Sequence, residues 1–201
     1  QPLVDELTKY LLYNIDPKWQ LLEASDTELC TISLSIIHKN TKKLDLTYCP
    51  NFGTCLTRSL LNESYNKVES LRHNLHTVIF RDNCKNENLQ ILEYCTGIIT
   101  LDISGSFDVS DLCVDYILNL KNLRSLNLEG SGVTSSGVNR IIHGDFPDIE
   151  IFIFNNFSPY NSQDILRFNK LKTLGMEVMD TNISSFTNLR NLKTLRLKKG
   201  N

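Results

Sequence analysis

Histidine and cysteine are the residue types in this chain with the clearest chemical potential. Imidazole nitrogens and thiolates are ligands that zinc prefers, so His73, His76, Cys84 and Cys95 are the set that would suit a metal ion. Their spacing matches no zinc-finger pattern, and none of the four histidines in the chain forms an HxxxH or HExxH pair. We therefore expect neither a metal ion nor another cofactor.

A glycine-rich stretch, "GSGVTSSG" at residues 130–137, resembles a phosphate-binding loop. It lacks the Lys-Ser/Thr ending of such loops and the glycine spacing of a dinucleotide-binding turn, so a turn between two elements is the better interpretation. The sequence also shows no nucleophile beside a base and no paired carboxylates. These observations predict a protein that is not an enzyme.

The composition is that of an ordinary globular domain, with 201 residues and a formal net charge of −2. Lysine and arginine are spread along the chain without forming a basic block, so we expect no nucleic-acid partner. No stretch approaches the roughly 20 apolar residues that a membrane-spanning helix needs. The chain does not begin with Met and its last repeat breaks off at "LRLKKGN", which predicts a fragment of a longer protein.

The six cysteines leave two compartments open. They could form three disulfides in a secreted protein, and three sequons, at Asn62, Asn156 and Asn182, are compatible with that interpretation. However, no CxxC pair is present, and Cys49 and Cys84 fall at turn positions after predicted strands, where small buried thiols are common. We expect a reduced protein in the cytoplasm or the nucleus.

The pattern LxxLxL recurs along most of the chain. Its fourth position is occupied in turn by Leu44, Val78, Leu101, Leu126, Ile151, Leu174 and Leu195. The intervals between these residues are 34, 23, 25, 25, 23 and 21, and a period of about 20–29 with this core is the signature of leucine-rich repeats. The sequence therefore predicts about seven irregular repeats over residues 41–201, preceded by an N-terminal helical region over residues 1–40.

Each repeat is expected to supply a strand and a helix. In "LRSLNLEGS" the alternation points Leu126 and Leu128 inward, and one such strand buries nothing unless its neighbours stack beside it. Apolar residues three and four apart predict helices over residues 55–71, 86–95, 109–120, 135–144 and 161–169, with at most a brief helix in the last linker. The fold class is thus an α/β leucine-rich-repeat solenoid, with parallel strands on its concave face and helices on its convex face.

A polar position follows each strand and is expected to satisfy backbone groups of the next loop. It is occupied in successive repeats by Cys49, Asn83, Ser106, Ser131 and Asn156. A buried Asn156 could not carry a glycan, which further weakens the secreted interpretation.

The outward strand positions form the expected binding surface, and most of them are polar. The predicted partner-binding residues on the concave face are Ile79, Arg81, Asp102, Asn127, Glu129, Phe152 and Phe154. Exposed aromatic side chains on such a face indicate a contact with another chain. The alternative is that the irregular repeat "IEIFIFNNF" buries Phe152 and Phe154 differently.

The N-terminus predicts an amphipathic helix over residues 3–13, with Leu3, Leu7, Tyr10 and Leu11 on one face. Such a helix would cap the open end of a solenoid. "PLVDELTKYL" also resembles the elongin-binding box of cullin-2 substrate receptors, in which Ser, Thr or Pro and then Leu precede a usual Cys and an aliphatic residue. Pro2, Leu3 and Leu11 match that box, while Leu7 stands where the Cys usually is.

The order of the parts, a box helix, further helices and irregular repeats such as "LDISGSFDVSD", resembles the ZYG (zygote-defective) family of leucine-rich-repeat substrate receptors. The resemblance implies a non-catalytic adaptor of a cullin-2 RING ubiquitin ligase. It also implies that Leu3, Leu7, Tyr10 and Leu11 bind elongin C, which joins elongin B and cullin-2, and that the repeats bind a protein substrate.

Two alternatives stay open. "VDELTKYLLYNIDPKWQLL" also resembles an F-box, which would bind Skp1, although the early Leu-Pro of that motif is Leu3-Val4 here. The other alternative is a plain leucine-rich-repeat interaction module that is unconnected to ubiquitin and whose N-terminal helix is only a cap.

Overall fold

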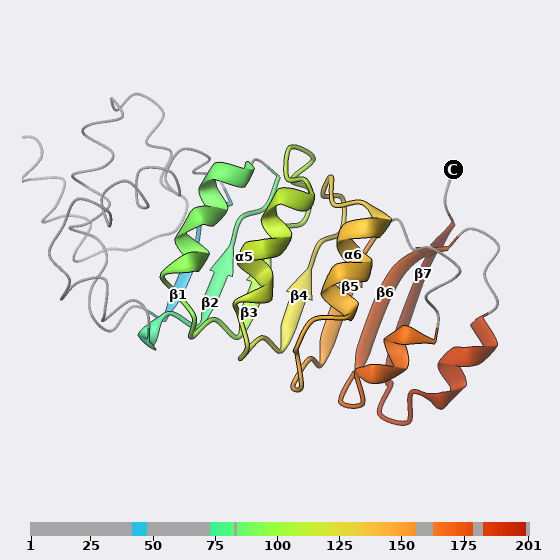
Figure 1. Cartoon of the computed structure of the whole chain (residues 1–201). Coiled ribbons are helices and arrows are strands. Elements are labelled where there is room, and N and C mark those ends of the chain that lie inside the picture. Colours follow the sequence, from blue (N-terminus) through green and yellow to red (C-terminus); the bar gives the residue numbers. More distant parts are fainter. Residues whose placement is uncertain (1–41, 48–72, 83, 156–162, 179–182, 200–201) are drawn as a thin grey trace, which may run out of the picture.

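A computed structural model describes residues 42–47, 73–82, 84–155, 163–178 and 183–199 of the chain. Seven parallel strands form one sheet in the order in which they occur along the chain (Figure 1). The strands are β1 (Lys43–Asp45), β2 (Thr77–Ile79), β3 (Thr100–Asp102), β4 (Ser125–Asn127), β5 (Ile151–Phe154), β6 (Thr173–Val178) and β7 (Thr194–Lys199). Parallel neighbours in sequence order, each reached by a crossover, confirm the predicted α/β leucine-rich-repeat solenoid.

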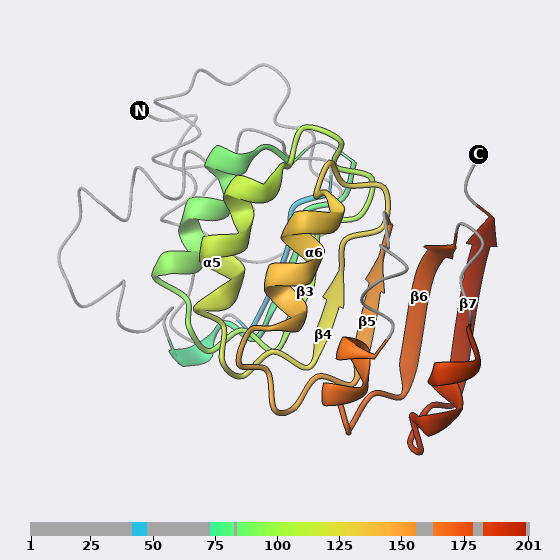
Figure 2. The same cartoon turned by 45° about the vertical axis from the view of Figure 1, so that its right-hand side comes forward.

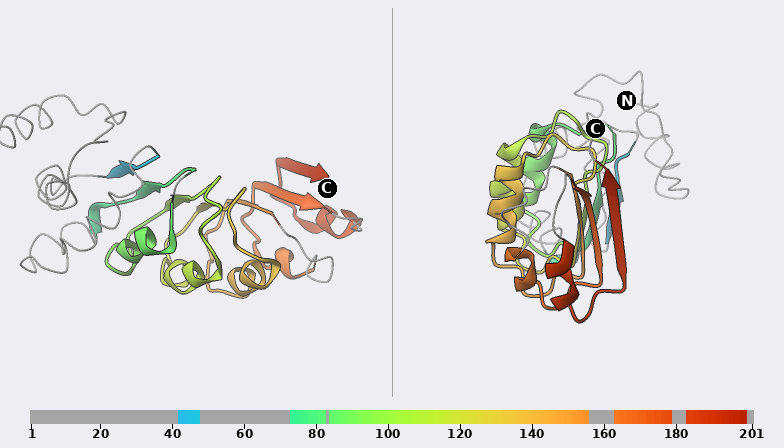
Figure 3. Two further views of the ribbon diagram at one scale, coloured as in Figure 1. Left: turned by 90° about the horizontal axis from the view of Figure 1, so that it is seen from above. Right: turned by 90° about the vertical axis from the view of Figure 1, so that its right-hand side faces the viewer.

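Helical segments cover one face of this sheet. They are the 3-10 helices η1 (Asn86–Glu93), η2 (Asp111–Cys113), η4 (Asp164–Arg167) and η5 (Ile183–Asn188) and the α-helices α5 (Val114–Leu118) and α6 (Ser135–Ile142). Figure 2 shows α5 and α6 in front of the strands, and Figure 3 shows the strands and helices as two separate layers of a curved stack. The predicted helices over 86–95, 109–120, 135–144 and 161–169 are confirmed in shorter form, while the one over 55–71 lies outside the described residues.

The register of the sheet aligns one inward residue from each repeat. Leu126 of β4 pairs with Phe152 of β5, and Phe152 pairs with Leu174 of β6. The prediction that Ile151 occupies this row is therefore wrong by one residue. The physical reason is that "IEIFIF" is apolar at both alternating sets of positions, so its pattern does not say which set faces the core.

The core lies between the two layers and consists mainly of aliphatic residues, with phenylalanines such as Phe152 and Phe168 among them. Val78, Leu101, Leu126 and Leu174 are all fully buried. At β7, the last strand of the sheet, Leu195 and Leu197 stay 40% and 42% exposed. No helix within the described ranges is long and apolar enough to cross a membrane.

In three successive repeats, the residue just before the recurring polar site of the loop (Asn83, Ser106 and Ser131) has a left-handed backbone conformation. Asp82 has φ 68°, and Gly105 and Gly130 both have φ 72°. A Cβ atom on Gly105 would lie 2.1 Å from Oδ1 of Asp82, so a side chain at this position would have to displace that carboxylate. Glycine adopts the left-handed conformation at least cost, and Asp82 shows that an aspartate can also adopt it in this row.

The polar position after each strand is confirmed where the structure describes it. Ser106 is fully buried and donates its hydroxyl to the carbonyl of Phe80 at 2.8 Å, while it accepts the backbone N–H of Cys84 at 3.3 Å. Ser131 is also buried and accepts the N–H of Val133 at 3.4 Å. Cys49, Asn83 and Asn156, the other predicted members of this row, lie outside the described residues.

Three cysteines are described, and all three are buried free thiols: Cys84, Cys95 and Cys113. Burial raises the pKa of Cys84 from its ordinary 9.0 to about 12 and does the same for Cys113. A thiol that stays neutral below this pKa is a poor nucleophile. These side chains therefore act as small apolar core residues.

We expect these three thiols to resist Ellman's reagent at pH 8 in the native protein and to react fully in denaturant. A variant with Ser in place of Cys30, Cys49 and Cys55 isolates the three described thiols. Because the folded-state pKa values of Cys84 and Cys113 lie above those of the unfolded chain, their stabilisation is present below about pH 9 and falls as the pH rises toward 12. Rapid labelling of the native variant would contradict the burial of these side chains.

Candidate protein-binding face

The strand layer presents three outward positions per repeat on the concave face of the solenoid. The first is mostly threonine or serine, as in Thr77, Thr100 and Ser125, and these side chains are half-buried. A β-branched or small hydroxyl residue suits a pleated surface that is open to water on one side. This row is polar except at Ile151, which pairs with Ser125 and Thr173, so most of the distinctive features come from the second and third positions.

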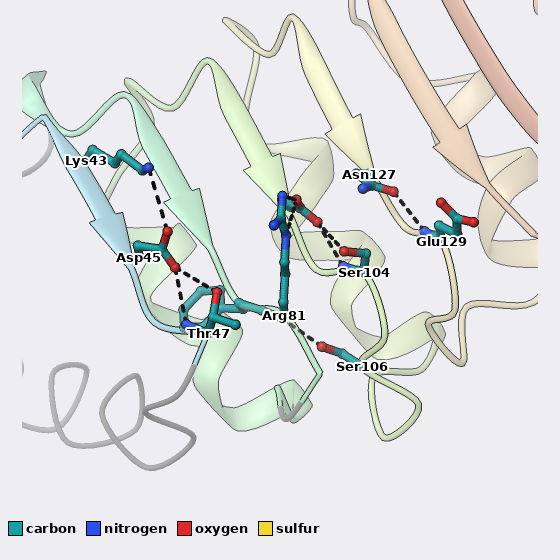
Figure 4. Close-up of polar contacts among 10 residues, drawn as sticks. Lys43, Asp45, Thr47, Arg81, Ser104, Ser106, Asn127 and Glu129 are labelled. Atoms are coloured by element: carbon teal, nitrogen blue, oxygen red, sulfur yellow. Dashed lines mark hydrogen bonds and ion pairs between the residues drawn. The ribbon is translucent and has the colours of Figure 1, made fainter. Parts of the chain in front are cut away.

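In three strands the last residue is an aspartate or asparagine, and its side chain accepts a hydrogen bond from the residue two positions on. Asp45 accepts the hydroxyl of Thr47 at 2.7 Å, and Asp102 accepts the hydroxyl of Ser104 at 2.7 Å and its N–H at 3.1 Å. Asn127 accepts the N–H of the residue two positions on, at 3.1 Å (Figure 4). These local bonds fix the carboxylates and the amide before any partner arrives.

An ion pair links two neighbouring repeats on this face. Nε of Arg81 donates to Oδ2 of Asp102 at 2.8 Å, and a second guanidinium nitrogen lies 2.6 Å from the same oxygen. The hydrogen bond and the charge of Asp102 both raise the pKa of Arg81, so the guanidinium stays ionised. Its side chain remains half exposed, whereas that of Asp102 is only 9% exposed. Arg81 therefore offers a positioned cation to a partner.

The prediction that Phe152 and Phe154 face outward is wrong. They are 0% and 1% exposed and pack against each other with ring centroids 4.4 Å apart. Phe168 meets Phe152 edge-on at 5.7 Å. The shift of one residue in β5 reverses which face each side chain occupies, so the alternative of burial in an irregular repeat holds. Both aromatic side chains are buried in the core, so neither is an exposed contact residue.

The same shift turns two isoleucines outward. Ile151 and Ile153 are half-buried on the concave side of β5, and the next strand has Gly175 beside Ile153. A Cβ atom on Gly175 would lie 2.8 Å from Cγ2 of Ile153, so the lack of a side chain at Gly175 leaves space for the isoleucine side chain. A hollow of about 160 Å³, which we call the concave hollow, lies at this point. Its lining consists of Glu129, Ile153, Phe154, Asn155, Gly175, Met176, Arg196 and Lys198.

Charged side chains from both sides surround the apolar floor of the concave hollow. Lys198 of β7 forms an ion pair with Glu129, which follows β4, although 69 residues separate them in the chain. The pair reaches across β5 and β6, which lie between β4 and β7 in the sheet. Within the described part of the chain, Arg196 forms no ion pair, so its charge is available to a partner.

The other predicted contact residues are distributed along the face. Ile79 is half-buried on β2, Arg81 is exposed, and Asn127 and Glu129 lie beside the concave hollow or line it. Leu3, Leu7, Tyr10 and Leu11, the predicted elongin-binding residues, lie outside the described residues. Arg196 and Lys198 were predicted to point outward on this face without being named as contact residues, whereas Ile151 and Ile153 were not predicted on this face. The two isoleucines could have been found from the sequence, because the LxxLxL pattern also fits this repeat with Ile149, Phe152 and Phe154 as its core residues. That alignment turns Ile151 and Ile153 outward.

Comparison with known proteins supports the fold. No protein-family model and no curated protein matches the chain. Among solved structures, internalin C2 from Listeria monocytogenes is similar, with a TM-score of 0.53 at 15% sequence identity over 95% of this chain and 84% of that chain. A second internalin (inlF) from the same bacterium gives 0.49 at 13% identity over 86% of this chain and 64% of that chain. At such low identity the likeness to internalin C2 shows the fold alone, which is that of a leucine-rich-repeat protein.

Proposed function

We propose that this chain is a non-catalytic protein-interaction module that binds a partner protein on its concave face. The observation that carries the proposal is the pair of half-buried isoleucines, Ile151 and Ile153, on a mostly polar sheet face, at the concave hollow that Ile153 lines. An apolar depression within a polar surface is the usual form of an interface anchor point. The concave hollow is large enough for one aliphatic side chain and too small for most cofactors.

The charges on the concave face suit recognition better than catalysis. Arg81 and Arg196 offer guanidinium groups at two points of the face, and the exposed pair of Lys198 and Glu129 can exchange for contacts with a partner. Arginine is enriched in protein interfaces, whose core is apolar and whose rim is polar. We therefore expect the partner to place an apolar side chain in the concave hollow and acidic groups near the arginines.

The test is a comparison of two charge-introducing variants. Ile153→Asp places a carboxylate in the concave hollow, and Gln90→Asp places one on the exposed surface of η1 in the helical layer. Partners captured by the wild-type protein are identified and their dissociation constants are measured with purified components. We expect Ile153→Asp to weaken the binding at least tenfold and Gln90→Asp to leave it unchanged. A partner that binds the Ile153 variant as tightly as the wild type would contradict the proposal.

As a finer function, we propose that the chain is a substrate-recognition adaptor of an elongin and cullin-2 ubiquitin ligase. The support is the sequence "PLVDELTKYL" and its place before the repeats. Leu3, Leu7, Tyr10 and Leu11 would pack into elongin C as one face of a helix, and the concave face would hold the substrate. Leu7 keeps an apolar side chain where the box usually has Cys.

Co-purification with elongin B, elongin C and cullin-2 tests this finer function. We expect all three to be captured by the wild type and lost with Leu3→Asp or Leu7→Asp. Lys9→Asp, which lies on the opposite side of the predicted helix, serves as the matched control. Capture of Skp1 instead would establish the F-box alternative, and capture of neither would leave the plain interaction module.

A further inference from the structure

A second hollow lies at the edge of the sheet where the strands begin. Its volume is about 330 Å³. Its lining consists of His73, His76, Thr96, Gly97, Ile99, Asn122, Arg124 and Asp148. None of these residues lines the concave hollow, so the two sites are separate. We call this one the edge hollow.

Three of these residues occupy the same position in consecutive repeats. The carbonyl of His76 accepts the N–H of Ile99 at 2.8 Å, and the carbonyl of Ile99 accepts the N–H of Arg124 at 2.8 Å. Neighbouring strands are about 4.8 Å apart, which puts the backbones of His76 and Arg124 roughly 10 Å apart, with Ile99 between them. The sheet thus holds an imidazole and a guanidinium on either side of one apolar side chain.

The negative charges near Arg124 are already paired. Lys170 holds the carboxylate of Asp148, and Nζ of Lys172 donates to Oε2 of Glu150 at 2.7 Å. The hydrogen bonds from these lysines lower the pKa of both acids, with a smaller contribution from Arg124. Both carboxylates therefore stay ionised and are matched by lysine. Among the described residues Arg124 forms no ion pair, so its charge is in excess.

The polar groups of the edge hollow are mainly donors. Arg124 carries five N–H donors, and His76 carries at least one ring N–H. The amide of Asn122 already donates to the carbonyl of Thr96 at 3.3 Å, and this hydrogen bond fixes the side of the edge hollow that these two residues form. A ligand that offers several oxygen acceptors and negative charge is complementary to such a lining.

We propose that the edge hollow binds a phosphate monoester, with Arg124 and His76 as its principal ligands. A monoester near neutral pH presents up to two negative charges and three acceptor oxygens, enough for the guanidinium fork and the imidazole to bind at once. A carboxylate has only two oxygens and one charge, which the guanidinium alone would use. This site is independent of the concave face, so a protein partner and the monoester can bind together.

The test uses O-phosphoserine as the probe and serine and acetate as controls, titrated into the ¹⁵N-labelled protein. Amide shifts at Gly97 and Arg124 report on the edge hollow. We expect saturable shifts with O-phosphoserine alone, a dissociation constant at least tenfold higher in Arg124→Gln, and a smaller increase in His76→Gln. Lys121→Gln removes a neighbouring exposed cation outside the edge hollow and should bind like the wild type.

Two results would overturn the proposal: equal binding of acetate and O-phosphoserine, or wild-type affinity in Arg124→Gln. The source of the monoester is distinguished by a phosphoserine peptide. Much tighter binding of the peptide than of free O-phosphoserine supports a phosphorylated side chain of a partner protein, and equal binding supports a small phosphorylated metabolite. Amide spectra of each variant without ligand establish that the fold is intact.

Discussion

Phe152→Ala is expected to lower the free energy of unfolding by about 3–5 kcal/mol, which is the usual cost of removing a fully buried aromatic side chain. Phe152 is 0% exposed and contacts two other rings, at 4.4 Å and 5.7 Å, so the surrounding core cannot easily collapse into the space. Urea denaturation with a fixed slope measures the change.

The neighbouring Ile151→Ala is the matched control because it shortens an outward side chain of the same strand. Ile151 is only half-buried, so we expect a loss of about 1 kcal/mol or less. The two substitutions therefore separate the two possible registers of β5. A larger loss from Ile151 than from Phe152 would show that the strand presents its other face to the core.

The repeat spacing was enough to predict the fold. Strands such as β4 alternate clearly, since Leu126 and Leu128 are apolar while Ser125, Asn127 and Glu129 are polar. This alternation, recurring at the right period, predicts both the parallel sheet and the layer of helices. Helix type was less predictable, because a 3-10 segment such as η1 has the same apolar spacing as an α-helix of one or two turns.

The site was predicted only in part, because some strands alternate apolar and polar residues clearly and others do not. Asp102 and Asn127 were assigned to the concave face because apolar and polar residues alternate clearly in their strands, and Arg81 was assigned there by the repeat spacing. In β5 every residue of Ile151–Phe154 is apolar, so only packing against Leu126 and Leu174 decides the register. The reach of Lys198 to Glu129 depends on the curvature of the sheet, which no local pattern encodes.

Asp102→Ala is expected to lower the free energy of unfolding by about 2–3 kcal/mol. The carboxylate is almost fully buried and satisfies the N–H and hydroxyl of Ser104 as well as the guanidinium of Arg81. Removing it leaves those donors without their acceptor, and the cost of unsatisfied donors to a charged group exceeds that of a neutral hydrogen bond. Thermal and urea unfolding of the variant measure the loss.

Asp45→Ala tests whether the large loss of stability expected for Asp102→Ala comes from the burial of Asp102 and its contact with Arg81. Asp45 makes the same bonds to Thr47, but its side chain is 28% exposed and its cation, Lys43, lies 3.6 Å away at the surface. Water replaces such exposed bonds, so we expect a loss of about 0.5–1 kcal/mol.

A double-mutant cycle then isolates the ion pair between repeats. If Arg81 is coupled to Asp102, Arg81→Ala costs less in the Asp102→Ala background than in the wild type. If Asp45→Ala and Asp102→Ala lower the free energy of unfolding equally and no coupling is found, the hydrogen bonds within each turn alone account for both losses. A measurable coupling would instead show that a charge on the binding face also holds two repeats together, so that a partner which takes Arg81 from Asp102 must overcome that stabilisation.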